Sequence, residues 1–170
     1  MNQNVTLVIG GARSGKSAES ISRAREHINS NGRVLFIATA EAVDDEMQLR
    51  IDNHRKERSS DFDLVEEPTD LVSALKQYPE NGLVIVDCLT IWLSNLMMAD
   101  IAAPIENVID AAKSRNGSTI FVTNETGEGI VPMHPVSRKF RDLSGSMNQS
   151  FARYCDEVIF MRFGIAVKLK

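Results

Sequence analysis

The sequence predicts an α/β fold in which a mostly parallel sheet is covered by helices on both faces. Five short runs of aliphatic and β-branched residues are almost continuously apolar, as in strands buried on both sides. Several of the segments between them have apolar residues at helical spacing. The glycine-containing turn signals at 10–11, 31–32 and 81–82 lie at the boundaries of these runs. Strands that alternate with helices are typical of a parallel sheet.

The predicted strands cover residues 5–9, 33–38, 83–87, 118–123 and 157–161. The predicted helices cover 16–29, 44–58, 89–97 and 136–154. In 44–58 the first turn is acidic, which suits the helix dipole. We expect the apolar stripes of the last two helices to face the core; they comprise Leu89, Trp92, Leu93, Leu96 and Met97, and Val136, Phe140, Leu143, Met147, Phe151 and Tyr154. Residues 59–68 have the weakest pattern, and no structure is predicted there.

The composition predicts one globular domain over residues 1–170. Nineteen Lys and Arg against 23 Asp and Glu give a net charge of −4, which argues against a nucleic-acid or anionic-lipid partner and favours small molecules. The two cysteines, Cys88 and Cys155, lie in apolar or helical stretches, so we expect buried thiols and a reducing, cytoplasmic setting. We expect neither a signal peptide nor a membrane span, because no apolar run approaches 18 residues.

A glycine-rich motif lies between the first predicted strand and the first predicted helix. It fits GxxxxGK[ST], the P-loop, whose backbone N–H groups surround phosphate oxygens at the start of a helix. The alternative is a turn that only caps the helix. We call these residues the phosphate cradle: Gly10, Gly11, Ala12, Arg13, Ser14, Gly15, Lys16 and Ser17. Lys16 is expected to contact the β- and γ-phosphates and Ser17 to bind Mg²⁺.

Asp87 ends the third apolar run, where P-loop proteins place the carboxylate that holds or orients the metal. The sequence therefore predicts Asp87 as the second Mg²⁺ ligand. An aspartate at a strand end can equally be a turn or helix-cap residue.

One of the three histidines is a candidate nucleophile. His54 shares a helix face with Met47, Ile51 and Arg58, and Arg50 lies one turn before it. The arginines favour neutral imidazole and would stabilise a phosphoryl group under attack. A hydrogen-bonded structural histidine is the alternative. His27 and His134 lie at a helix end and in a loop, and no catalytic role is predicted for them.

Motifs along nearly the whole chain resemble the bifunctional adenosylcobinamide kinase / adenosylcobinamide-phosphate guanylyltransferase family of cobalamin biosynthesis. They are GGARSGKS (10–17), FIATA (36–40), DDEMQLRIDNHRKER (44–58), VDCLTIWLSNL (86–96), VTNETGEGIVP (122–132), RKFRDLSGSMNQ (138–149) and DEVIFMRFGIAVKLK (156–170). The departures include Asp87, where the family often has Glu, Asn53, where it often has a first histidine, and a short stretch between 96 and 118.

The resemblance implies a RecA-like P-loop NTPase fold and two reactions. ATP or GTP phosphorylates adenosylcobinamide; GTP then guanylylates His54, and the GMP passes to the new phosphate to give adenosylcobinamide-GDP. It also implies a homo-oligomer, in this family a trimer. Beyond the phosphate cradle, the nucleotide contacts that it implies fall on Ala38, Thr39, Ala40, Arg55, Lys56, Glu57, Arg58, Glu66 and Asp87.

Two other functions fit the residues. One is a simple small-molecule kinase in which His54 is structural, and the other is a nucleotide-binding switch without catalysis. Only the guanylyltransferase forms a covalent GMP adduct.

Overall fold

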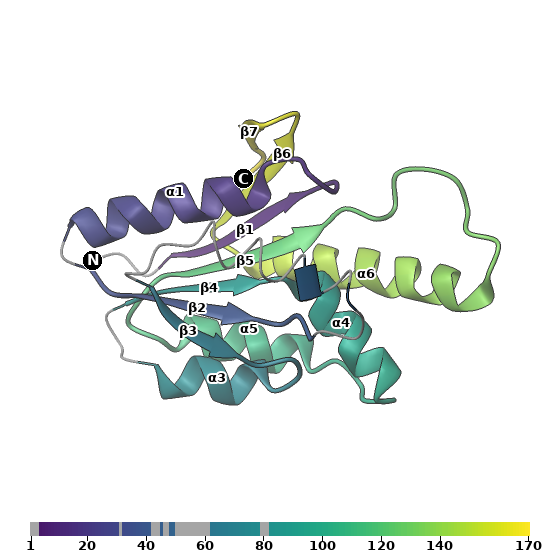
Figure 1. Ribbon diagram of the computed structural model, residues 1–170, viewed down its shortest axis with the longest axis horizontal. Helices are drawn as coiled ribbons and strands as arrows, with labels where there is room; N and C mark the ends of the chain where they lie inside the picture. The colour runs from purple at the N-terminus through teal and green to yellow at the C-terminus, as the bar shows by residue number, and fades with distance from the viewer. Residues whose placement is uncertain (1–3, 31, 42–44, 46–47, 50–61, 79–81) are drawn as a thin grey trace.

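The computed structural model describes residues 4–30, 32–41, 45, 48–49, 62–78 and 82–170. Their strands form one sheet in the order β3-β2-β4-β5-β1-β6-β7 (Figure 1). All neighbouring pairs are parallel except β6 with β7, which are antiparallel. The strands are β1 (Val5–Gly10), β2 (Val34–Ala38), β3 (Asp63–Glu66), β4 (Leu83–Asp87), β5 (Thr119–Asn124), β6 (Glu157–Arg162) and β7 (Ile165–Lys168).

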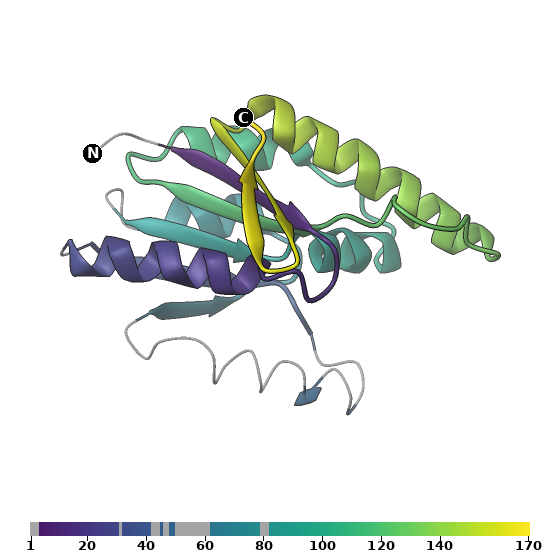
Figure 2. The same ribbon diagram turned by 90° about the horizontal axis from the view of Figure 1, so that it is seen from above.

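Helices pack against both faces of the sheet, as predicted (Figures 1 and 2). One face is covered by α3 (Leu71–Gln77), α4 (Leu89–Met98), α5 (Ile105–Lys113) and α6 (Pro135–Tyr154), and the other by α1 (Lys16–Asn29). Strand side chains alternate between the two layers: in β4, Val84 and Val86 join the larger core cluster, whereas Leu83 and Ile85 join the cluster beneath α1. The central strands β1, β2, β4 and β5 are therefore buried on both sides, which explains their near-continuous apolar runs.

Four elements were not predicted from the sequence. β3 forms within 59–68 and is exposed throughout, so its residues lack a buried face that would have revealed it. β7 is likewise an exposed edge strand. The short helices α3 and α5 lie between predicted elements. In the predicted helix 44–58, Asp45, Gln48 and Leu49 are helical, and the other positions lie outside the described residues.

The apolar stripe of α6 faces the core only in part. Met147 and Phe151 are fully buried, but Val136, Leu143 and Tyr154 are exposed, so the prediction is wrong at these three positions. The first half of α6, which contains Val136 and Leu143, extends beyond the ends of the strands (Figure 1), where no sheet lies beneath it, and Tyr154 is the last residue of the helix. Helical period alone cannot indicate where the neighbouring layer ends.

The two cysteines are buried and unpaired with each other, as predicted. Burial raises the pKa of each thiol to about 12. Within the part of the chain that the structure describes, no helix is long and apolar enough to cross a membrane.

Candidate active site

The carboxyl ends of the parallel strands bring the candidate residues to one edge of the sheet. Gly10 at the end of β1 pairs with Asn124 of β5. Ala38 at the end of β2 pairs with Asp87 of β4 on one side and with Glu66 of β3 on the other. Ligands of open α/β sheets bind at this edge. The register therefore places the phosphate cradle, Asp87 and the predicted contacts at 38–40 and 66 along one side of the molecule.

The phosphate cradle has the backbone geometry of an anion-binding loop. The Ser14 N–H group donates to the Gly11 carbonyl at 3.3 Å, and Gly15 has a left-handed φ of 102° before α1 begins at Lys16. At Gly10, a Cβ atom would collide with the Met161 carbonyl oxygen of β6, so only glycine fits there. The loop thus leads from β1 directly into the N-terminus of α1, where free N–H groups attract phosphate.

Two buried polar groups inside the loop suit a phosphate ligand. Lys16 is only 8% exposed, and its Nζ donates to the Gly11 carbonyl at 2.6 Å. Burial lowers the pKa of its ammonium group, while Cys88 and Asp87 act in the opposite direction. The Ser14 hydroxyl is buried and has no hydrogen-bond partner among the described residues. Burying such a hydroxyl costs free energy unless a ligand or a water molecule forms a hydrogen bond with it.

Ser17 and Asp87 lie together beside the loop. The Ser17 hydroxyl donates to Asp87 Oδ2 at 3.2 Å, joining the first turn of α1 to the end of β4. Among the described residues no cluster of three or more His, Cys, Asp or Glu side chains could hold a metal. Mg²⁺ needs no such cluster, because it retains waters and takes phosphate oxygens with one or two protein oxygens. The Ser17–Asp87 pair therefore fits Mg²⁺ bound together with a nucleotide.

Thr39 is fully buried and holds the end of β4 in place. Its hydroxyl donates to the Cys88 carbonyl and accepts from the Cys88 N–H group, each at 2.8 Å. Its own N–H donates to the Asp87 carbonyl at 3.2 Å. The Asn95 amide of α4 in turn donates to the Thr39 carbonyl at 2.8 Å. These bonds indicate that Thr39 positions Asp87.

The other predicted nucleotide contacts differ in their burial, and some of them lie outside the described residues. Ala38 is buried, Ala40 is half-buried, and Glu66 is exposed at the end of β3. Nucleotide contacts at Ala38, Thr39, Ala40 and Glu66 stay predictions. The candidate nucleophile and the cationic stretch after it lie outside the described residues; these are His54, Arg55, Lys56, Glu57 and Arg58. Of the other histidines, His27 lies in the last turn of α1, away from the cradle, and His134 is exposed before α6.

Sequence reasoning assigned no role to a buried polar network behind the cradle. The Thr123 hydroxyl donates to Asn148 Oδ1 at 2.8 Å and lies 3.3 Å from the Thr90 hydroxyl. Asn148 Nδ2 donates to the Asn124 carbonyl, and the Asn124 N–H group donates to Thr90. The Glu125 N–H group then donates to the Gly10 carbonyl. The polar residues at the end of the fourth predicted strand were the sequence signal that could have revealed this network, because that strand ends beside β1 and the cradle.

Comparison with known proteins identifies relatives over almost the full length. A family model described as cobinamide kinase / cobinamide phosphate guanyltransferase matches residues 6–169. The chain is similar to the bifunctional adenosylcobalamin biosynthesis protein CobP of Pseudomonas aeruginosa, with 39% identity over 169 residues and 96% of each chain covered. It is also similar to the bifunctional adenosylcobalamin biosynthesis protein CobU of Escherichia coli, with 36% identity over 182 residues, covering 96% of this chain and 98% of that protein.

Two solved structures share the fold. The flagellar accessory protein FlaH from Methanocaldococcus jannaschii has a TM-score of 0.59 at 14% identity, covering 98% of this chain and 78% of that one. A second solved structure, which contains an ATPase domain, has a TM-score of 0.55 at 12% identity, covering 93% of this chain and 69% of that one. At this identity the likeness concerns the fold alone, and it agrees with the predicted α/β fold, a mostly parallel sheet with helices on both faces.

Proposed function

The chain belongs to the cobinamide kinase / cobinamide phosphate guanyltransferase family, and we propose that its two reactions use one nucleotide site, the phosphate cradle. The kinase and guanyltransferase activities, and a place in adenosylcobalamin biosynthesis, follow from the family and its relatives. The observation that supports the cradle as a nucleotide site most strongly is the 3.2 Å hydrogen bond between Ser17 and Asp87. It joins the helix that follows the cradle to the strand end that supplies the acid.

In the kinase reaction, the cradle holds the triphosphate of ATP or GTP, and Lys16 contacts its β- and γ-phosphates. The hydroxyl oxygen of adenosylcobinamide forms the new bond to the γ-phosphorus, the bond to the β–γ bridging oxygen breaks, and the hydroxyl proton is released. Ser17 and Asp87 would hold Mg²⁺, which would neutralise charge on the phosphate oxygens. The orphaned Ser14 hydroxyl and the buried Lys16 ammonium support this assignment.

In the guanyltransferase reaction, a nitrogen of His54 attacks the α-phosphorus of GTP and pyrophosphate leaves. An oxygen of adenosylcobinamide phosphate then attacks the same phosphorus and displaces His54, which gives adenosylcobinamide-GDP. The family motif around His54 supports this role, together with the chain path: β2 ends at Ala38, beside Asp87, and the segment containing His54 follows it. Arg55, Lys56, Glu57 and Arg58 complete the proposed nucleotide contacts, with Ala38, Thr39, Ala40 and Glu66 at the strand ends.

We further propose that residues 1–170 act as a single domain in a cytoplasmic homo-oligomer, a trimer by family resemblance. Its partners are small molecules, and a net charge of −4 argues against nucleic acid.

Labelling with GTP that is radioactive at the α-phosphate tests the covalent step. We expect wild-type protein and the control variant His27→Asn to form an acid-labile, base-stable adduct. We expect His54→Asn to form none while retaining kinase activity, because γ-phosphoryl transfer needs no covalent protein intermediate. An adduct on His54→Asn at the wild-type level would overturn the assignment of the nucleophile.

A further inference from the structure

The turn between β6 and β7 lies directly against the phosphate cradle. The Gly164 N–H group at this turn donates to the Ser14 carbonyl at 3.0 Å. A Cβ atom on Gly15 would lie 3.3 Å from Gly164 Cα and 3.3 Å from Met161 Cε, tighter than ordinary packing. The turn and the loop therefore pack backbone against backbone, and whatever the turn exposes lies on the rim of the cradle.

The turn exposes an aromatic ring. Phe163 is 85% exposed and has a φ of 55°, a left-handed conformation that is unfavourable for a bulky residue. The guanidinium carbon of Arg162 lies 5.3 Å from the centroid of its ring. A turn with a purely structural role would be served better by glycine or asparagine at this position. An exposed ring in a strained conformation beside a ligand site indicates a role in binding.

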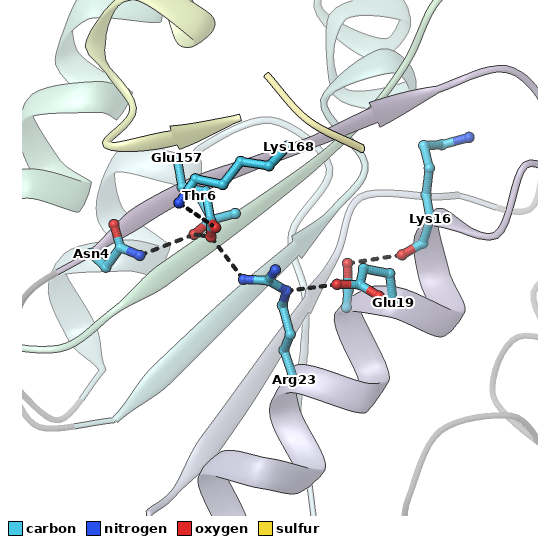
Figure 3. Close-up of polar contacts among 8 residues, drawn as sticks. Asn4, Thr6, Lys16, Glu19, Arg23, Glu157 and Lys168 are labelled. Atoms are coloured by element: carbon cyan, nitrogen blue, oxygen red, sulfur yellow. Dashed lines mark hydrogen bonds and ion pairs between the residues drawn. The ribbon is translucent and has the colours of Figure 1, made fainter. Parts of the chain in front are cut away.

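Ion pairs fix this hairpin to the helix that begins at the cradle. Glu157 of β6 pairs with Arg23 of α1 at 2.8 Å and with Lys168 of β7 at 3.2 Å, and it accepts from the Thr6 hydroxyl at 3.3 Å (Figure 3). Arg23 also pairs with Glu19, one turn earlier in α1. These contacts join the hairpin to α1, the helix that begins at the cradle, and so position the hairpin relative to the phosphate-binding backbone.

We propose that Phe163, backed by Arg162, is the surface on which the base of the bound nucleoside triphosphate stacks. The proposal rests on the proposed function, since it takes the phosphates to lie in the cradle. With the phosphates there, the base remains tethered through the ribose close to this rim. Every base has a π face, so the ring accepts adenine and guanine alike, and the guanidinium behind it adds a cation–π contact.

Calorimetric titration with GTP, ATP and inorganic tripolyphosphate separates the base from the phosphates. We expect Phe163→Ala to bind GTP and ATP roughly tenfold more weakly and tripolyphosphate as wild type does. Phe163→Tyr keeps the ring and should restore nucleotide affinity. Leu169→Ala is the matched control, because Leu169 is 63% exposed on the same hairpin and lies away from the turn.

A second variant separates binding from folding. Phe163→Asn removes the ring but suits the left-handed backbone, so its melting temperature should equal or exceed that of wild type while its GTP affinity falls as in Phe163→Ala. Wild-type GTP affinity in Phe163→Ala would overturn the stacking proposal alone. If Phe163→Ala lost tripolyphosphate binding to the same extent as GTP binding, the stacking proposal would also be overturned, and the ring would instead maintain the shape of the loop. If its nucleotide affinity were unchanged but its sedimentation coefficient altered, the ring would belong to a subunit contact. If the wild-type protein bound none of GTP, ATP and tripolyphosphate, both the cradle assignment and this proposal would be overturned.

Discussion

Replacement of Thr39 by valine removes the hydroxyl that holds the end of β4 while keeping the side-chain volume. The Cys88 carbonyl still accepts from the Trp92 N–H group at 3.1 Å, so it keeps a partner. The buried Cys88 N–H group loses the Thr39 oxygen that it bonds at 2.8 Å. One buried donor without a partner costs about 2 kcal/mol. For a chain of this size, that lowers the melting temperature by about 4–8 °C.

The same substitution should disturb the metal site, because Asp87 directly precedes Cys88. We expect Thr39→Val to raise the Mg²⁺ concentration needed for half-maximal kinase activity roughly tenfold. Thr39→Ser keeps the hydroxyl and should stay close to wild type in its Mg²⁺ dependence. Thermal melts and Mg²⁺ titrations of the three proteins provide the comparison. A Thr39→Val protein with normal stability and normal Mg²⁺ dependence would refute this reasoning. If only its nucleotide KM were raised, Thr39 would act solely as the nucleotide contact proposed above.

Further predictions concern the metal ligand, the thiols and the nucleophile. Asp87→Asn should reduce Mg²⁺-dependent turnover more than nucleotide affinity, since the proposed task of Asp87 is to orient the metal; a lowered melting temperature with unchanged Mg²⁺ dependence would instead assign it to capping. Cys88 and Cys155, whose pKa values burial raises to about 12, should resist iodoacetamide at pH 8 in the native protein and react after denaturation, as followed by mass spectrometry. Guanylyl transfer should decline as the pH is lowered, because protonation of His54 removes the attacking lone pair, and a transfer rate that rises towards acid would argue against a histidine nucleophile.

The cradle could be predicted from the sequence because its geometry is local. The spacing from Gly10 to Ser17 within one strand–loop–helix unit determines where the N–H groups point. The position of Asp87 beside the cradle could also be predicted, because Asp87 ends an apolar run and parallel strands end at a common edge. The general architecture followed from the alternation of buried runs with helical segments.

Features that depend on contacts between distant segments could not be predicted in the same way. Asn148 and Thr123 look like ordinary polar residues until α6 is placed behind β5, where they bond at 2.8 Å. The exposed apolar residues at the start of α6 follow the helical period of a core stripe, yet the sheet ends before reaching them. Phe163 gains its significance only when the β6–β7 turn is found against the cradle.

If one phosphate cradle serves both reactions, Lys16→Ala should disable both of them. Kinase turnover and formation of the labelled GMP adduct should be measured on the same preparation, with Lys76→Ala, an exposed lysine in the last turn of α3, as the control. Loss of this phosphate contact should reduce both reactions by about 10² or more. The Lys76→Ala protein should retain both. Adduct formation at the wild-type kcat/KM in a Lys16→Ala protein that has lost kinase activity would exclude a shared cradle and require a second phosphate site.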